Sequence, residues 1–366
     1  MSATPMPILK KRQLEDYVRS RYGPKAQLDT YGPIGKETSG TKYKQYGYGA
    51  PIRLNIRLGG RLVRIVLGTM SPGPFGHEHM ADRAQAMLWD YDSYARLPRH
   101  VRSLDVGAFT SDGTLMSVAA GREYFVVNEW SEGEGYDQDL QRLSRTGKVR
   151  ALDRRRTVAM AGYLASIHRV KRRDADLYRR RLRELIGHGE CIMGLTDSYP
   201  KRYAFITEAL LRSIEEACNR WRWKLRGKSR RLSQVHGDFH PWNVLFRRGT
   251  DFTVVDRSRG EWGDPADDVT AMTINYVFFS LIRWGTLRGP FEVLFRTFWE
   301  TYLAKSKDDE VLETTAPFFA FRGLVIASPL WYPDLSITVR KKLFRFIENV
   351  LAIQKFNPAD VNRYCE

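Results

Sequence analysis

The hydrophobic pattern of this chain changes once, near Ser131, and that change limits the folds the chain can adopt. Before it, Pro51–Leu58 and Leu62–Leu67 alternate apolar and polar residues around a Gly-Gly pair, which is typical of a β-hairpin. After it, long segments repeat apolar residues at helical spacing. We therefore expect an α+β protein with a small strand-rich N-terminal lobe over residues 1–131 and a larger, mostly helical C-terminal lobe over residues 132–366.

The same patterns predict the individual elements of each part. In the first part we expect helices over Ile8–Tyr22 and His77–Tyr94, and further short strands over Ser103–Phe109, Leu115–Ala119 and Tyr124–Trp130. In the second part we expect helices over Arg154–Arg169, Asp176–Ile186 and Ala204–Trp223, then short strands over Ser233–Val235, Val244–Phe246 and Phe252–Val255, and helices from there to the end.

Composition excludes several classes of protein. The 366 residues are 43% hydrophobic, which is too apolar for a disordered chain. The longest apolar stretch, Ala271–Trp284, is shorter than the roughly 20 residues that span a bilayer, so no transmembrane helix is predicted. The N-terminus shows no secretory pattern and the three cysteines are unpatterned, which indicates reduced thiols and a cytoplasmic location.

Three oxygen-bearing side chains are placed to converge at one strand edge. Asp238 and Asn243 lie five residues apart in QVHGDFHPWNVLF, between two apolar strands, and Asp256 ends the next strand. Phosphoryl transfer requires a carboxylate to orient and deprotonate a hydroxyl, and hard oxygen ligands to hold magnesium on the phosphates. The segment therefore indicates phosphotransferase chemistry.

These residues resemble the catalytic loop and metal-binding segment of the aminoglycoside phosphotransferase and choline kinase family, whose fold is the bilobal protein-kinase-like fold. The resemblance implies that Asp238 is the catalytic base and that Asn243 and Asp256 bind Mg²⁺. It also implies that His236 stabilises the catalytic loop and that Asp268, which follows Gly-Asp-Pro-Ala, caps or anchors it.

The resemblance extends to the nucleotide. It implies ATP, or GTP, as the phosphate donor, with the backbone of Glu129 and Ser131 bonding the base at an interlobe hinge. The family's third-strand lysine is missing, and Arg64 either replaces it or lies on a solvated strand face. Glu78 or Asp82 would be its acidic partner, and Gly40, Gly47 and Gly49 would form the loop over the phosphates.

The charge of the chain bears on the acceptor. The formal net charge is +17, and nearly all of the excess lies between Leu140 and Leu232. Such a field repels a polycationic aminoglycoside and favours a small-molecule hydroxyl acceptor that carries phosphate or carboxylate, or a nucleic-acid partner. The alternative is a solvated helical face with Trp221 and Trp223 in the core. A second class of function is an inactive kinase-like module that binds an anionic partner.

Overall fold

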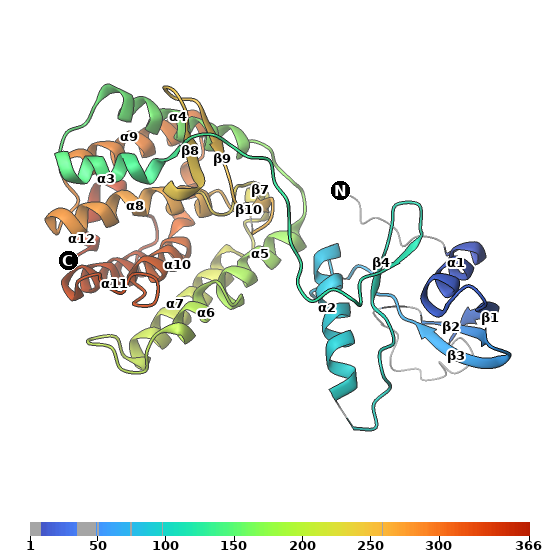
Figure 1. Cartoon of the computed structure of the whole chain (residues 1–366). Coiled ribbons are helices and arrows are strands. Elements are labelled where there is room, and N and C mark those ends of the chain that lie inside the picture. Colours follow the sequence, from blue (N-terminus) through green and yellow to red (C-terminus); the bar gives the residue numbers. More distant parts are fainter. Residues whose placement is uncertain (1–8, 35–48, 50, 74, 97, 258) are drawn as a thin grey trace. The chain divides into compact units, whose positions relative to one another are not determined.

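The chain forms two compact units, Met1–Asn128 and Glu129–Glu366, in a computed structural model that describes residues 9–34, 49, 51–73, 75–96, 98–257 and 259–366 (Figure 1). The boundary between the units lies close to Ser131. The smaller unit contains an antiparallel sheet, and the larger one is mostly helical. The α+β class expected from the sequence is confirmed.

In its described part, the smaller unit contains an antiparallel sheet in the strand order β1-β2-β3, with helix α1 beside β1, and a second antiparallel pair, β4-β5. Its elements are α1 (Lys11–Tyr22), β1 (Gln27–Pro33), β2 (Ile52–Leu58), β3 (Arg61–Leu67), α2 (Met80–Ser93), β4 (Gly107–Phe109) and β5 (Leu115–Ser117). Alternation places Leu54 and Ile56 of β2 on the buried face, where they meet Leu14 and Val18 of α1. The predicted hairpin is confirmed, and β1 was not predicted.

The predicted strand over Tyr124–Trp130 is wrong. The structure has no strand there, and the side chains of Phe125 and Trp130 are 89% and 85% exposed. An apolar run becomes a strand only when a neighbouring strand pairs with its backbone. No described strand pairs with this segment, so its composition alone was misleading.

The larger unit is a set of helices with short strands between them. The helices are α3 (Tyr136–Thr146), α4 (Ala151–Ile167), α5 (Ala175–Gly187), α6 (Ile192–Ser198), α7 (Glu208–Leu225), α8 (Ala266–Trp284), α9 (Gly289–Ser306), α10 (Thr315–Ala327), α11 (Ile337–Ala352) and α12 (Val361–Tyr364). The strands are β6 (Glu134–Gly135), β7 (Ser233–Gln234), β8 (Val244–Phe246), β9 (Phe252–Val254) and β10 (Trp262–Gly263). They pair antiparallel as β6-β8-β9 and β10-β7.

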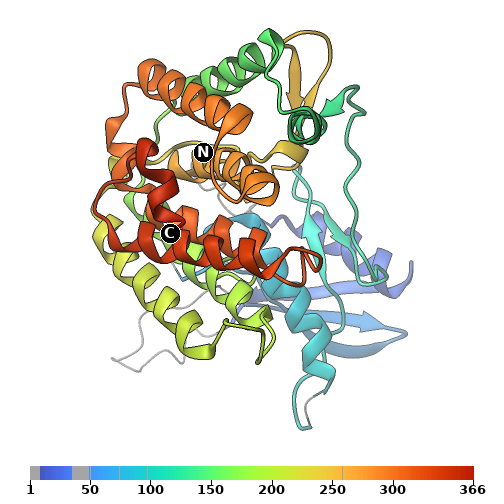
Figure 2. The same ribbon diagram turned by 90° about the vertical axis from the view of Figure 1, so that its left-hand side faces the viewer.

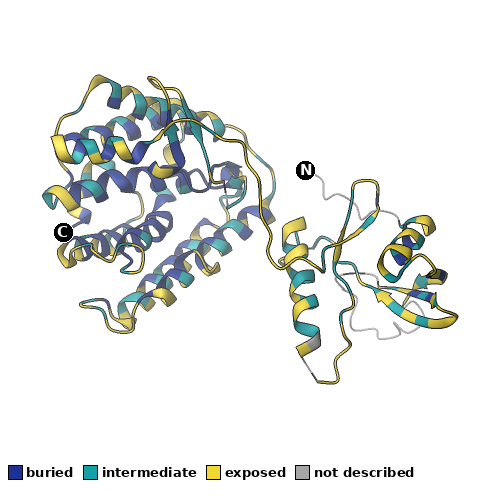
Figure 3. Cartoon of the chain, in the orientation of Figure 1, coloured by how far each residue is buried: buried dark blue, intermediate teal, exposed yellow. Residues whose placement is uncertain are grey.

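Helices α8 and α10 form the centre of this unit. Both are apolar around nearly their whole circumference, as expected for helices that are buried on all sides. Their residues are mostly dark blue in Figure 3. The C-terminal helices, red in Figure 2, pack against the orange ones, and α11 contacts α10 along its length. Within the described part of the chain, no helix has the length and apolarity needed to cross a membrane.

Candidate active site

The loop between β7 and β8 is held by a buried carboxylate. Asp268, in the first turn of α8, accepts the backbone N–H of His236 at 2.8 Å and that of Gly237 at 2.7 Å. Gly237 has φ of +85°, a left-handed conformation that glycine adopts without strain. The anchoring role expected for Asp268 is therefore confirmed.

The carboxylate of Asp268 is itself held in place by a buried histidine. Its Oδ2 lies 3.1 Å from Nε2 of His168, whose Nδ1 lies 2.8 Å from the hydroxyl of Tyr302. Burial raises the pKa of Asp268, but its hydrogen bonds to His168 and to the backbone of His236 outweigh burial and lower the pKa below the usual value. The carboxylate thus stays charged and keeps its hold on the loop.

His236 lies inside the loop and is buried. Its Nδ1 accepts the backbone N–H of Asp238 at 3.3 Å, and its ring stands edge-on to Phe239 with 5.8 Å between the ring centroids. Burial lowers the pKa of His236. A neutral imidazole suits this acceptor role.

Asp238 lies between two arginines and a histidine. Arg322 of α10 donates from Nη1 to its Oδ1, Nε2 of His240 lies 3.5 Å from its Oδ2, and Nη1 of Arg259 lies 3.8 Å from its Oδ1. Burial raises the pKa of Asp238, but His240, Arg322 and Arg259 together hold it far below its usual range. Asp238 is therefore an ionised carboxylate at neutral pH.

Asn243 and Asp256 are brought together by strand pairing. Asn243 directly precedes β8, donates from Nδ2 to the backbone oxygen of Asp238 at 3.0 Å, and accepts the N–H of Val255 on its own backbone oxygen at 3.0 Å. That pairing places Asp256, one residue beyond Val255, beside Asn243. Among the described residues, no hydrogen bond or ion pair engages the Asp256 carboxylate.

Asp256 also has an unusual backbone. Its φ is +59°, in the left-handed region that costs a non-glycine residue about 1 kcal/mol. Its side chain borders a cavity of about 220 Å³, which Tyr163, Val235 and His236 also line. Strain of this kind gathers at functional sites, where the surrounding structure enforces it.

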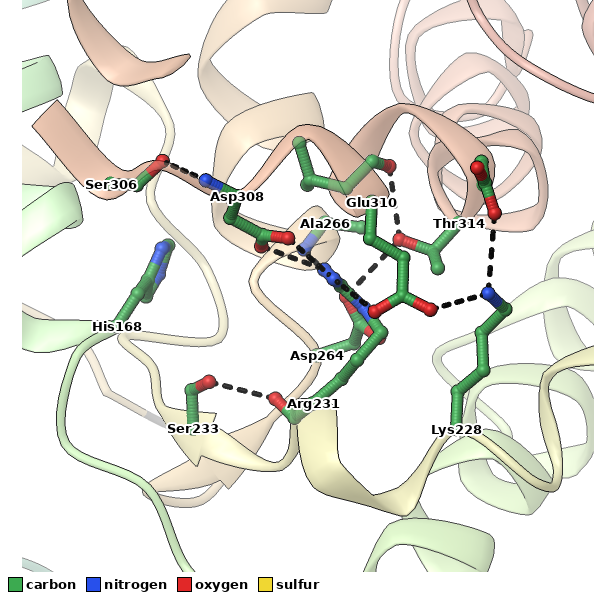
Figure 4. Close-up of polar contacts among 12 residues, drawn as sticks. His168, Lys228, Arg231, Ser233, Asp264, Ala266, Ser306, Asp308, Glu310 and Thr314 are labelled. Carbon is green, nitrogen blue, oxygen red and sulfur yellow. Dashed lines mark hydrogen bonds and ion pairs between the residues drawn. The ribbon is translucent and has the colours of Figure 1, made fainter. Parts of the chain in front are cut away.

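The segment after Asp256 is anchored by a buried ion-pair network (Figure 4). The carboxylate of Asp264 accepts hydrogen bonds from Nε and Nη2 of Arg231, at 2.9 and 3.0 Å, and from the hydroxyl of Tyr178 at 2.9 Å. Arg231 also binds Asp308, at 2.8 and 3.1 Å. Because a buried charge is tolerated only when it is paired, this network fixes the start of α8 and hence Asp268.

Arg322 and Arg259, the two arginines near Asp238, were not predicted from the sequence. Arg322 could have been noticed, since it is the one charged residue in the otherwise apolar helix α10 and therefore needs a buried partner. Arg259 lies in an irregular loop, and no sequence pattern indicated it. His240 follows Phe239 in the motif, but its spacing alone does not assign it a role.

The remaining candidates are placed elsewhere. Glu129 and Ser131 lie in extended chain before β6, and the described residues include no contact between them and Asp238, Asn243 or Asp256. Within the described residues, no group of three or more His, Cys, Asp or Glu side chains is arranged to hold a metal ion.

In the smaller unit, Arg64 is on the exposed face of β3, opposite Asn55. Asp82 accepts the backbone N–H of His79 at 2.7 Å at the start of α2. Of the predicted phosphate-loop glycines, Gly40 and Gly47 lie outside the described residues. Gly49 approaches Thr69 so closely that a Cβ there would lie 1.7 Å from its backbone oxygen.

The basic segment is engaged within the larger unit only in part. Arg231 is buried in its network, and Arg142 pairs with the buried carboxylate of Asp153. Trp221 is buried and donates from Nε1 to the backbone oxygen of Leu351 at 2.9 Å, whereas Trp223 is 57% exposed. The expectation that both tryptophans are buried is confirmed for Trp221 alone.

Comparisons with known proteins find solved structures to which the chain is similar. Similar solved structures include a glucosamine kinase in complex with glucosamine, ADP and inorganic phosphate, at 19% identity over 59% of this chain and 57% of that chain, with a TM-score of 0.36. An amicoumacin kinase in complex with AMP-PNP, Ca²⁺ and Ami is 12% identical over 96% of this chain and 97% of that chain, with a TM-score of 0.42. A Plasmodium vivax ethanolamine kinase is 10% identical over 92% of this chain and 80% of that chain, with a TM-score of 0.36.

A comparison with curated proteins finds none that matches. The model of the phosphotransferase enzyme family matches residues 104–296, which include the loop around Asp238, strand β9 and helix α8. The resemblance to aminoglycoside phosphotransferases and choline kinases is confirmed by that match. Since the match covers more than half of the sequence, the chain belongs to the phosphotransferase enzyme family.

Proposed function

We propose that the protein transfers the γ-phosphoryl group of ATP to a hydroxyl group of a small molecule. The observation that carries this proposal is the loop pinned by Asp268, which holds Asp238 and Asn243 next to the strand leading to Asp256, in a chain of the phosphotransferase family. In the reaction the bond from the γ-phosphorus to the ADP oxygen breaks as the acceptor oxygen bonds to phosphorus, and the hydroxyl proton leaves the acceptor.

In this proposal, Asp238 orients the acceptor hydroxyl and receives its proton. Its low pKa makes Asp238 a weak base, so orientation is the larger part of its contribution, as suits a transition state in which phosphorus–oxygen cleavage runs ahead of bond formation. His236 maintains the loop by accepting the N–H of Asp238.

The residues present fit a magnesium ion. Asn243 uses its Nδ2 within the loop, so its Oδ1 is the atom available as a ligand, and Asp256 supplies a carboxylate that the described residues leave uncommitted. Mg²⁺ prefers hard oxygen ligands and is commonly held by one or two protein groups plus phosphate oxygens and water. When bound, the ion would neutralise charge on the phosphates.

For the nucleotide, we keep the proposal that the backbone of Glu129 and Ser131 contacts the adenine base. Both residues lie at the predicted boundary between the two lobes. ATP is the proposed donor, and GTP is the alternative. A cytoplasmic location also stays a prediction. We do not propose the binding-module alternative or a nucleic-acid partner, since the family match favours a phosphotransferase and part of the basic segment pairs with acidic residues.

The experiment that tests the function combines binding and turnover. Magnesium-ATP at 100 times its dissociation constant should stabilise the protein by about 2.7 kcal/mol, and Asp256→Ala should remove the magnesium-dependent part of that shift. Asp238→Asn should keep the shift and lower turnover by about 100-fold to 10,000-fold. Asparagine is the suitable replacement because it keeps the volume beside Arg322. Full turnover in Asp238→Asn would contradict the assigned role.

A further inference from the structure

The neighbourhood of Asp238 contains buried hydrogen-bond donors with nothing to bond. Nε and Nη1 of Arg259 are both shielded from solvent without a hydrogen-bond acceptor in the described structure, and so are Nε of Arg322 and Nε of Arg181. Leaving such donors unsatisfied costs free energy, and each instance in a native structure needs an explanation. One explanation is a bound ligand whose oxygen atoms accept these hydrogen bonds.

Arg259 is held in place beside the catalytic loop. Its guanidinium lies over the ring of Phe321, 4.7 Å from the centroid, and its backbone oxygen accepts a hydrogen bond from Nη1 of Arg181 at 3.1 Å. Its Cβ faces Gly237, where an added Cβ would lie 3.3 Å away. The side chain is still 23% exposed. Arg259 is therefore a fixed, partly exposed cation whose Nη1 lies 3.8 Å from Oδ1 of Asp238.

The acidic groups that contact this cluster are already paired. Arg322 binds Asp238 with Nη1 and Asp267 with Nη2, and Glu184 is bound by Arg181 at 2.6 Å. An amine-bearing acceptor would have to compete with these arginines for a carboxylate. An anion would instead meet the partly exposed guanidinium of Arg259, whose Nε and Nη1 have no acceptor among the described residues, and a guanidinium suits phosphate and carboxylate.

We propose that Arg259 binds an anionic group of the acceptor, a phosphate or a carboxylate, while Asp238 orients the acceptor's hydroxyl. The proposal rests on the proposed function and names the substrate class for the same site. The γ-phosphoryl group of the donor is a second anion that Arg259 could bind. The experiment distinguishes binding of the acceptor's anionic group from binding of the γ-phosphoryl group.

The experiment uses acceptors that share a carbon skeleton and differ in charge: glucose, glucosamine and glucose 6-phosphate, and ethylene glycol, ethanolamine and glycolate. ADP release is measured with the full-length protein and with Arg259→Gln. Arg259→Lys keeps the charge without the fork. Arg248→Gln is the matched control, because Arg248 is exposed in the turn after β8 and its loss changes the net charge equally.

The expected result is highest turnover with the anionic member of a set. Arg259→Gln should then raise KM for that acceptor about tenfold or more and leave KM for ATP unchanged, Arg259→Lys should lie in between, and Arg248→Gln should match the unmodified protein. Preference for a neutral or cationic member would overturn the inference. So would a rise confined to the KM for ATP, which would assign Arg259 to the γ-phosphoryl group.

If no member of either set is phosphorylated, the binding of sulfate tests whether Arg259 binds an anion. Sulfate is titrated into protein loaded with magnesium and a non-hydrolysable ATP analogue, so that the γ-phosphate position is filled. Sulfate binding that weakens about tenfold in Arg259→Gln but not in Arg248→Gln supports the inference, and no binding at 50 mM, on the order of the weakest useful affinity, overturns it. Failure of the proposed function is distinct, since the protein would then not respond to magnesium-ATP at all.

Discussion

The two units of this protein are stabilised in different ways. The larger unit has an extensive core rich in aromatic residues, whereas the described part of the smaller unit has a core of six buried apolar residues, and none of its α2 residues is buried (Figure 3). Stability follows the apolar area removed from water, so the smaller unit should open more readily. The candidate site residues Asp238, Asn243 and Asp256 all lie in the unit with the larger core.

The units also differ in how they use charge. Asp264 and Asp268 of the larger unit are buried and bonded on several sides. In the smaller unit, ion pairs such as Arg12–Asp16 and Arg96–Asp92 lie at the surface, although Arg21 pairs with the mostly buried Asp105. Surface pairs contribute about 0–1 kcal/mol, whereas removing one member of a buried pair is strongly destabilising.

The largest effect is expected from breaking the buried network with Arg231→Met. Asp264 and Asp308 would lose their partner, and we expect the free energy of unfolding of the larger unit to fall by about 3–5 kcal/mol, as measured by urea denaturation. Arg230→Met is the control, because Arg230 is the adjacent exposed arginine and should change stability by less than about 0.5 kcal/mol. Equal effects of the two variants would contradict the network's importance.

The next effect probes the small core. Leu54→Ala removes a fully buried side chain from β2 and should destabilise the smaller unit by about 3 kcal/mol. Hydrogen exchange should then accelerate over Gln27–Leu67 and stay unchanged in α8. Leu62→Ala, on the exposed face of the same sheet, should leave both rates as they were. Exchange that accelerates in both units together would show that they unfold as one.

The smallest effect is expected from Arg64→Ala. Because Arg64 is on the exposed face of β3, we expect the free energy of unfolding to change by less than about 0.5 kcal/mol and turnover to stay within about twofold. A steady-state assay at saturating ATP measures it. A large rise in KM for ATP would instead assign Arg64 the role of the missing lysine.

Local sequence patterns correctly predicted those helices and strands that show a clear hydrophobic period. Strand β8 was predicted with its observed bounds, Val244–Phe246, and helix α4 to within a few residues, because periodicity and flanking polar residues are visible in the sequence. Tyr124–Trp130 has an equally strong pattern but no pairing partner, and helices α3 and α6 were missed. Pairing and packing between distant segments are not encoded in a local period.

The same distinction holds for the site. Asp238, Asn243 and Asp256 could be proposed from the sequence because they share one loop and one strand pair, and Asp268 because it follows closely. Arg322 acts on Asp238 from 84 residues further along the chain. Only the three-dimensional structure shows that contact, although a lone arginine in an apolar helix was a sign that some partner exists.

That distance has a consequence for how the protein is made. A chain grows from its N-terminus, and segments can fold as they emerge. Asp238 is synthesised well before Arg322, so during translation its carboxylate waits without its main partner until α10 has left the ribosome. The pairing of Asp238 with Arg322 is thus a late event in biosynthesis, and a nascent chain that ends before Arg322 carries the whole motif without this partner.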